Sequence, residues 1–247
     1  MHLQPQKPDT ISTIKYICPL LLGLFFVSFS HLAFAQSPVA SQEFTVGDYA
    51  EVEVSTSGGR IEVIGKSTTK VTVNAIAYVN GRRSSNANLD NWSITIEEIQ
   101  GKIVAKAEKE SNMGWLRCCK DESIAFEIET PVNTELNART SGGSVSIENL
   151  SGNQYARTSG GRMEANNIQG NVEMRTSGGA IRLENIEGQA EVATSGGSIR
   201  AKKVTQGLKA RTSGGSLHLQ EISGSLEART SGGSIDVRLV NPIEYIE

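Results

Sequence analysis

The sequence is poor in aromatic side chains. Its 247 residues include only 6 Phe, 5 Tyr and 2 Trp, whereas glycine occurs 25 times. A compact core of this size usually depends on large rings, so the composition indicates an interior of a different kind. Glycine without a period of three excludes collagen, and 38% hydrophobic with 21% charged residues excludes a disordered polyelectrolyte or a membrane bundle.

Long apolar runs are missing except near the start. Lys7 and Lys15 precede an apolar run over residues 17–35, which ends in Ala33-Phe34-Ala35. This is the pattern of a cleaved secretory signal, although the run is nearly long enough for a retained anchor. Its polar interruptions and small-x-small end favour cleavage. We therefore predict a signal peptide over 1–35 and an exported protein, in the periplasm, on the outer surface or secreted, with no transmembrane segment after cleavage.

Cysteine is scarce as well. Apart from Cys18 in the leader, the chain contains only the adjacent pair Cys118 and Cys119. A bridge between neighbours closes a strained ring, so a vicinal disulfide, intermolecular bridges and free thiols all remain open. With only Met113 nearby, the pair lacks the ligands of a metal site, and we expect neither a metal nor a cofactor.

A tandem repeat dominates the second half of the chain. The sequence Thr-Ser-Gly-Gly recurs every 18 residues without insertion or deletion. Six units cover residues 138–245, and a seventh copy, Thr56-Ser57-Gly58-Gly59, lies 84 residues upstream of the first. The six regular copies begin at Thr140, Thr158, Thr176, Thr194, Thr212 and Thr230. A fixed period of this kind is the signature of a repeat architecture.

Each unit has the alternation of two short strands. Apolar and polar residues alternate after the glycine pair, as in residues 181–184, and again before the motif, as in 172–176. Glycine corners separate the runs, and we expect the paired glycines to adopt positive φ. These predicted turn glycines are Gly142, Gly143, Gly160, Gly161, Gly178, Gly179, Gly196, Gly197, Gly214, Gly215, Gly232 and Gly233.

Two short strands cannot bury an apolar face alone, but stacked copies of equal length can. We therefore predict an all-β fold, a parallel β-solenoid with 18-residue coils and two or three faces. Its narrow interior would hold columns of small aliphatic residues and no rings. The repeat has neither the even apolar spacing of a hexapeptide helix nor the aspartates of a calcium-binding β-roll. The expected columns are Val145, Met163, Ile181, Ile199, Leu217 and Ile235, and Leu150, Ile168, Ile186, Val204, Ile222 and Val240.

Residues 36–137 also have strand periodicity, but no fixed repeat. Alternation marks strands near 52–63 and 71–78, a hairpin around Gln100-Gly101, and a strand over 125–129 that ends before Pro131. We predict a domain of wider, irregular coils that caps or continues the regular solenoid of 138–247. An uncapped stack exposes strand edges, so we also expect end-to-end self-association when the cap is absent.

The repeats resemble a known family. Short strands punctuated by TSGG, the segment 124–137 (IAFEIETPVNTELN) that leads into them, and an export signal are similar to the bacterial DUF4097 proteins, which have a proposed role as adhesins. The resemblance extends from Phe44 to the end of the chain. It implies an envelope β-solenoid and brings no catalytic or ligand-binding residues. The strict period and the Cys118-Cys119 pair depart from the family pattern.

Arginine recurs at one position of the repeat, at Arg139, Arg157, Arg175, Arg211 and Arg229, with Ala193 as the exception. This stripe could bind an acidic glycan or lipopolysaccharide, but the glutamates two residues earlier at 173, 191 and 227 favour charge pairing instead. The formal net charge of −3 argues against nucleic acid as a partner.

No constellation of catalytic residues is visible. Repeated Thr-Ser hydroxyls lack a base, because the chain after the leader contains only His218, and a ladder that satisfies turn amides is the favoured role. Glu148, Glu164, Glu184 and Asp236 are scattered, and an asparagine ladder at a corner explains Asn149, Asn167 and Asn185 better than a ligand site. We predict a non-enzymatic scaffold or adhesion module that presents a rigid face to an unknown surface protein or glycan. A periplasmic structural protein linked to envelope stress is the alternative, and a polysaccharide-binding or polysaccharide-cleaving β-helix is a weaker one.

Overall fold

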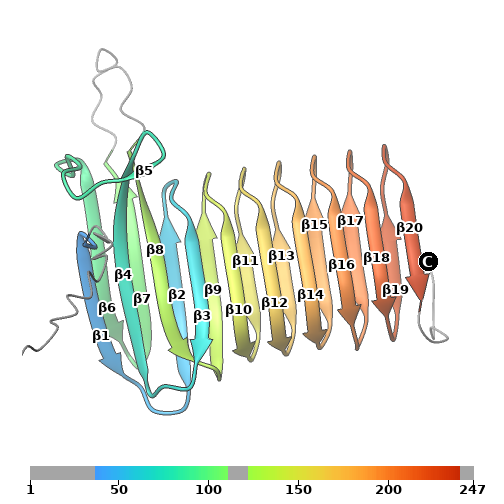
Figure 1. Cartoon of the computed structure of the whole chain (residues 1–247), viewed down its shortest axis with the longest axis horizontal. Coiled ribbons are helices and arrows are strands. Elements are labelled where there is room, and N and C mark those ends of the chain that lie inside the picture. Colours follow the sequence, from blue (N-terminus) through green and yellow to red (C-terminus); the bar gives the residue numbers. More distant parts are fainter. Residues whose placement is uncertain (1–36, 111–121, 240–247) are drawn as a thin grey trace, which may run out of the picture. The chain divides into compact units, whose positions relative to one another are not determined.

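The computed structural model describes residues 37–110 and 122–239, which belong to one compact unit that begins at Gln36. Every regular element in these ranges is a β-strand, and the strands form two sheets (Figure 1). The predicted signal peptide, the Cys118-Cys119 pair and residues 240–247, including Val240, lie outside the described residues.

The strands are assigned to two sheets, here named sheet A and sheet B. In sheet A the spatial order is β1 (Ala40–Thr45), β4 (Lys70–Val79), β8 (Glu122–Pro131), β3 (Ile61–Lys66), β10 (Val145–Ser151), β12 (Met163–Gln169), β14 (Ile181–Glu187), β16 (Ile199–Val204), β18 (Leu217–Ile222) and β20 (Ile235–Leu239), with β5 (Arg82–Arg83) beside β4. In sheet B it is β19 (Leu226–Arg229), β17 (Leu208–Thr212), β15 (Ala190–Thr194), β13 (Val172–Arg175), β11 (Gln154–Arg157), β9 (Thr134–Thr140), β2 (Ala50–Thr56), β7 (Lys102–Lys109) and β6 (Trp92–Ile99).

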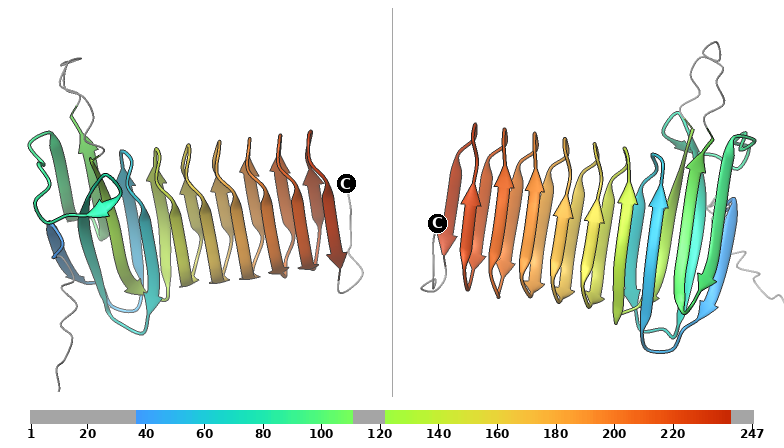
Figure 2. Two further views of the ribbon diagram at one scale, coloured as in Figure 1. Left: turned by 45° about the horizontal axis from the view of Figure 1, so that its top comes forward. Right: turned by 180° about the vertical axis from the view of Figure 1, so that it is seen from behind.

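The regular repeats form a parallel β-solenoid with two faces. Each coil contributes one strand to sheet B, turns through Thr-Ser-Gly-Gly, and returns as one strand of sheet A. Equivalent residues pair in parallel from coil to coil, as Met163 does with Ile181 and Val172 with Ala190. The predicted fold class is thus confirmed, with sheets A and B as its two faces (Figure 2).

Aliphatic columns fill the space between the sheets. The column from Val145 to Leu217 and the column from Leu150 to Ile222 are buried along their whole described length. Ile235, in the last coil, is exposed because β20 has a neighbour on one side only. Among residues 37–110 and 122–239, the one fully buried ring is that of Phe126, which belongs to β8 outside the regular repeats. The interior is therefore as narrow as the shortage of aromatics suggested.

The paired glycines do not adopt positive φ, which corrects the expectation for this corner. The second glycine of each pair is needed for close approach instead. A Cβ on Gly197 would lie 2.0 Å from the carbonyl oxygen of Gly179 in the preceding coil, whereas a Cβ on Gly196 would meet nothing closer than 3.7 Å. The backbones of successive coils touch at this point, so only the second position requires the absence of a side chain.

The threonine of the motif ties successive corners together. Thr194 Oγ1 donates a hydrogen bond to the Gly179 carbonyl (2.9 Å) and accepts one from its own Gly197 amide (3.2 Å). The other copies repeat this pattern, and Thr140 Oγ1 bonds to the Gly59 carbonyl at 2.8 Å. The predicted hydroxyl ladder thus exists, and it consists of the threonines.

At the other end of each coil, the chain turns just after the repeat position that Asn149, Asn167 and Asn185 occupy. Asn149, Asn167 and Asn185 have φ of 58°, 54° and 55°, and their side-chain amides bond to one another at 3.0 Å, which confirms the predicted ladder. Lys203 and Glu221 continue the column with φ of 58° and 57°. These five residues, and glycines such as Gly152 and Gly170, carry the left-handed backbone that the motif glycines were expected to carry.

The region before the repeats continues the stack in a different order. The upstream motif copy joins β2 to β3, and this coil lies directly beside the first regular coil, with Thr56 paired to Thr140 and Ile61 to Val145. The strands β7 and β8, which come later in sequence, form the next coil outward. The chain therefore passes over the β2–β3 coil on its way from β8 to β9.

Antiparallel strands, and not wider coils, extend the stack beyond β7 and β8. In sheet A, β4 pairs antiparallel with β8 and β1 pairs antiparallel with β4. In sheet B, β6 and β7 form the predicted hairpin, with φ of 53° at Gln100 and 81° at Gly101. The strand predicted over 125–129 extends to Pro131. The expectation of irregular coils holds for β7–β8 and is wrong for these outer strands.

Candidate binding face

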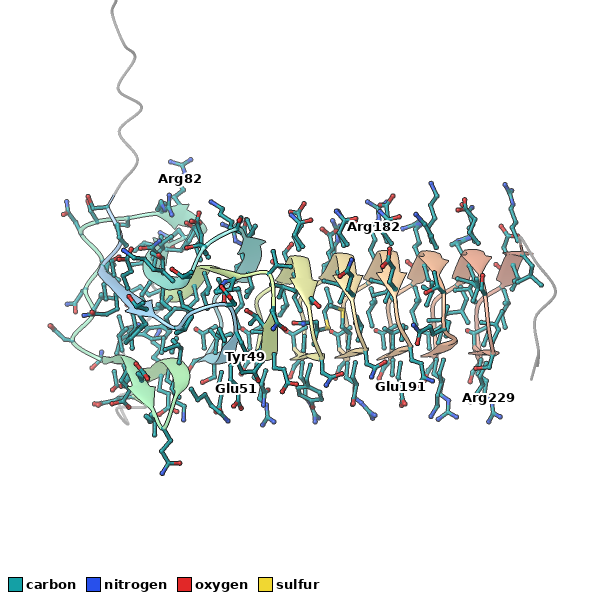
Figure 3. All side chains as sticks on the ribbon, turned by 90° about the horizontal axis from the view of Figure 1, so that it is seen from below. Tyr49, Glu51, Arg82, Arg182, Glu191 and Arg229 are labelled. Carbon is teal, nitrogen blue, oxygen red and sulfur yellow. The ribbon has the colours of Figure 1, made fainter. Side chains whose placement is uncertain are left out.

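The outward side of sheet B, here called the sheet B face, carries rows of like side chains. Because strand neighbours are one coil apart, each outward position of the repeat becomes a row across the sheet. Figure 3 shows Glu191 and Arg229 projecting from this side and Arg182 from the opposite side, which belongs to sheet A. The candidate site is built from these rows.

The predicted arginine stripe forms one such row. The parallel register places each member of the row beside the next, in the order Arg139, Arg157, Arg175, Ala193, Arg211 and Arg229. The 18-residue spacing therefore predicted correctly that these residues lie in one row. Whether they bind an anion stays a prediction.

Glutamates of the next row pair with three of the arginines. Arg175 Nε lies 2.8 Å from Glu173 Oε1, and its Nη2 lies 3.2 Å from Glu191 Oε1. Glu227 Oε1 accepts hydrogen bonds from Arg211 Nε at 3.0 Å and lies 3.2 Å from Arg229 Nε. This alternation relieves the repulsion of stacked cations, although exposed pairs contribute little to stability.

The pairing shifts the titration of its members. A hydrogen bond from Arg211 is the main cause that lowers the pKa of the Glu227 carboxyl, and the hydrogen bond to Glu173 is the main cause that raises the pKa of Arg175. Both groups therefore stay charged near neutral pH. The central part of the row is a neutralised lattice of charges and not a free cationic stripe.

The arginines nearest β2 differ from the rest. The Arg139 guanidinium lies 5.5 Å from the centre of the Tyr155 ring, and its Nε donates to Asn137 Oδ1 at 3.2 Å. Arg157 has no acidic partner among the described residues. Both border a hollow of 270 Å³ beside Ser57. If the stripe binds an anion, this is the part of it whose arginines form no ion pair with the glutamate row of the described sheet.

A larger groove crosses the sheet B face at the starts of its strands. Its volume is 570 Å³, and it extends over five coils from β11 to β19. Each coil contributes the same three positions, the residue before the strand and the first two of the strand. The lining residues are Asn153, Gln154, Tyr155, Asn171, Val172, Glu173, Gln189, Ala190, Glu191, Gly207, Leu208, Lys209, Ser225, Leu226 and Glu227.

The groove offers hydrogen-bonding groups beside an aromatic ring. Asn171 Nδ2 donates to Asn153 Oδ1 at 3.2 Å, and Asn171 Oδ1 accepts from the backbone amide of Gln189 at 3.3 Å, so amides form a second ladder. Glu191 links the row to Lys209, whose Nζ lies 3.4 Å away. Tyr155 supplies a ring at one end. The groove thus combines amides, carboxylates that pair with neighbouring cations, and apolar side chains, at positions repeated along one direction.

Gln154 is an unusual residue below this groove. It occupies the core column that holds Leu136 and Val172 in the neighbouring coils. Its Nε2 donates to the Thr134 carbonyl at 2.8 Å, but its buried Oε1 has no partner. A buried acceptor without a partner is costly, so this position weakens the core at the groove.

The acidic residues considered for catalysis lie apart on sheet A. Glu164 stands between Ser146 and Arg182, and Glu148 is paired with Asn166. Asp236 Oδ2 lies 3.9 Å from His218 Nδ1, with no second carboxylate beside them. In the part of the chain that the structure describes, no group of three or more His, Cys, Asp or Glu could hold a metal ion.

No pattern in the sequence indicates the groove. In the sequence its lining residues are ordinary inward and outward strand positions and the residue before each strand, where Asn, Gln, Gly and Ser occur without a shared type. The one available signal is that Asn, Asn, Gln and Ser precede four of the five strands. The described residues contain no helix with the length and apolar character needed to cross a bilayer.

The fold and its repeated surface define a β-solenoid repeat protein. The chain belongs to the Toastrack DUF4097 family, whose pattern matches residues 49–246. This confirms the family resemblance noted from the TSGG strands. Comparison with curated proteins gives no match.

Three solved structures resemble the chain. One is a proposed cell adhesion protein from Clostridium sporogenes, with 10% identity, a TM-score of 0.38, and coverage of 83% of this chain and 100% of that one. A proposed adhesin from Bacteroides fragilis has 12% identity, a TM-score of 0.41 and coverage of 84% and 96%. A proposed lipid-binding protein from Parabacteroides distasonis has 15% identity, a TM-score of 0.36 and coverage of 86% and 98%.

Proposed function

We propose that this chain is an exported, non-catalytic binding scaffold of the bacterial cell envelope. Its groove on the sheet B face would hold an extended partner, and a glycan is the ligand class that the side chains fit best. The proposal rests on one observation, the 570 Å³ groove that presents equivalent positions in five successive coils. The predicted signal peptide supports export.

A repeated groove suits a repeated ligand. Strands in a sheet lie about 4.8 Å apart, so equivalent side chains recur at that spacing along the groove. A linear polymer could meet several coils at once, and each contact would add to the effective affinity of the next. A compact small molecule would use only one or two coils.

The chemistry of the lining favours hydroxyl groups. Side-chain amides at Asn153 and Asn171 can donate to and accept from hydroxyls, and the carboxylates of Glu173 and Glu191 can accept from them. Tyr155 can pack its ring against the apolar face of a sugar. Because Glu173 and Glu191 already balance Arg175, we expect a neutral glycan to bind better than an acidic one.

Binding to a glycan array, with the chain from residue 36 onward, tests this proposal. We expect retention of neutral linear glycans, and a loss of about tenfold in affinity for Tyr155→Ala and for Asn171→Leu, since each removes about 1.4 kcal/mol of contact. The matched controls are Arg182→Ala and Glu184→Ala on the sheet A face, which should bind as the parent does.

The same array separates the competing functions. Retention of acidic glycans that disappears when Arg139 and Arg157 are both changed to Gln would assign binding to the arginine stripe and overturn the groove. Equal losses in the sheet A controls would also overturn it. Absence of any glycan or cell-surface binding would support the alternative of a structural envelope protein without an adhesive ligand.

A further inference from the structure

The solenoid ends in an open pair of strands. Among the strands that the structure describes, β19 and β20 each have a neighbour on one side only. The apolar side chains of β20 that continue the core columns are uncovered, with Ile235 44%, Val237 36% and Leu239 41% exposed. An exposed edge with an apolar row is a template for pairing with another strand.

The backbone direction shows which groups face outward at this edge. The carbonyl of Ser234 accepts a hydrogen bond from Leu217 of the preceding coil at 2.9 Å. Because successive residues of a strand point to opposite sides, the N–H and C=O groups of Ile235 and Val237 point to the open side. Pairing with a further strand would use these residues.

The sequence of β20 is complementary to itself in the antiparallel direction. If two copies of Ile235–Leu239 pair around Val237, Ile235 faces Leu239 and Asp236 faces Arg238 of the other copy. Val237 then forms a hydrogen-bonded pair, which places Asp236 and Arg238 at the closer, non-hydrogen-bonded positions. Parallel stacking of identical strands would instead set Asp236 against Asp236.

The sequence of β19 has the same property. Antiparallel pairing around Ala228 sets Leu226 against Thr230 and Glu227 against Arg229. The Ala210 position, one coil inward, pairs with Ala228 in the parallel register. The edge residues of β19 are therefore an acid and an arginine that flank a small apolar residue, as they are in β20.

One twofold axis serves both strands. Ala228 lies four residues before Gly232, and Val237 lies four residues after Gly233, so the two stand at the same distance from the corner between them. A twofold axis that is perpendicular to both sheets and lies at the level of Ala228 and Val237 therefore pairs each strand with its own copy. Such an interface is isologous and closes at two subunits.

We propose that two copies of this chain associate through the β19–β20 end as an antiparallel, twofold dimer centred on Val237 and Ala228. The two sheets would continue across the interface, and Ile235, Val237 and Leu239 would become core residues. The sheet B faces of both copies would lie on the same side of the dimer. The last coil of the groove, at Ser225, Leu226 and Glu227, lies at the start of β19 and therefore borders this interface.

Sedimentation of the chain from residue 36 onward, over about two decades of concentration, tests the proposal. A reductant keeps Cys118 and Cys119 from forming bridges between copies. We expect a monomer–dimer equilibrium. Asp236→Arg sets arginines opposite each other twice in each dimer and should raise the dissociation constant about tenfold, and Arg238→Asp should act alike.

The double reversal of Asp236→Arg with Arg238→Asp restores opposite charges across the axis. It should return the dissociation constant to within about threefold of the parent value. Lys202→Asp is the matched control, because Lys202 occupies the Arg238 position two coils inward and should leave the dimer unchanged. A double reversal as weak as either single change would overturn the antiparallel register.

A backbone change tests the edge itself. Val237→Pro removes an N–H that points to the open side and leaves the bonds to β18 in place, so the variant should be a folded monomer. A monomeric parent at every concentration would overturn the proposal, and so would open polymers that lengthen with concentration. A dimer that survives Val237→Pro would do the same.

Discussion

At one end of each regular coil the chain turns through Thr-Ser-Gly-Gly, and at the other it turns at a residue with left-handed backbone. The first corner has the same sequence in the six regular coils and in the β2–β3 coil, while the second has Asn149, Asn167 or Asn185 in three coils and Lys203 or Glu221 in two. One corner is constant in sequence and the other varies because the two corners contact different groups.

Backbone meets backbone at the Thr-Ser-Gly-Gly corner. The second glycine lies against the carbonyl of the same glycine one coil away, and the threonine hydroxyl binds that carbonyl. A change in one coil therefore acts on its neighbour. At the other corner the side chain at the left-handed position projects outward, so the local backbone conformation is the main demand and several residues can meet it at some cost.

The largest expected effect separates the two glycines of one motif. Gly197→Ala places a Cβ 2.0 Å from the Gly179 carbonyl oxygen, which forces the coils apart and should lower the free energy of unfolding by about 3 kcal/mol. Gly196→Ala should stay within about 0.5 kcal/mol of the parent, since its Cβ has room. Urea unfolding monitored by circular dichroism measures both, and equal losses would show that the contact is not what fixes this position.

The second comparison concerns the two hydroxyls of the same motif. Thr194→Val leaves the partly buried Gly179 carbonyl and Gly197 amide without this partner and should destabilise by about 1–3 kcal/mol. Ser195→Ala removes an exposed hydroxyl and should change stability by less than about 0.5 kcal/mol. The same unfolding assay checks this order. A serine effect as large as the threonine effect would contradict the assignment of the ladder to threonine.

The smallest expected effect is a gain at the opposite corner. Lys203→Asn and Glu221→Asn replace side chains that disfavour positive φ with the residue type that accepts it best after glycine. Each should raise the free energy of unfolding by about 0.5–1 kcal/mol. Lys202→Asn is the control, because its backbone is an ordinary strand. Thermal unfolding measures the gain, and a loss at both positions would show that a long side chain is needed there.

The sequence predicted the regular solenoid because each element of it repeats. Eighteen-residue spacing fixes which residues pair, so the columns beginning at Val145 and Leu150 and the arginine row followed directly. The glycine conformation was mispredicted because a glycine can serve either positive φ or close approach, and the spacing does not distinguish these. The close approach at Gly197 involves the backbone of the neighbouring coil, which the sequence of one coil does not reveal.

The N-terminal region and the groove were beyond sequence reasoning. The motif at Thr56 is out of phase with the repeats because β7 and β8 are inserted on its far side, a connection that no local pattern reveals. The groove depends on the depth of a surface between strands. Nothing in the types of Asn171 or Gln189 indicates that depth.

Removal of one complete coil tests the central claim that the 18-residue coil is the structural unit. Deleting residues 177–194 joins Thr176 to Ser195 and keeps every column in register, with β13 beside β17 and β12 beside β16. We predict a folded chain with a strand spectrum per residue like that of the parent and a single cooperative unfolding transition. Deleting 177–193, one residue fewer, reverses which side chains face inward in the joined strand or distorts the corner, and should prevent folding. Equal folding of both deletions, or failure of both, would contradict the account.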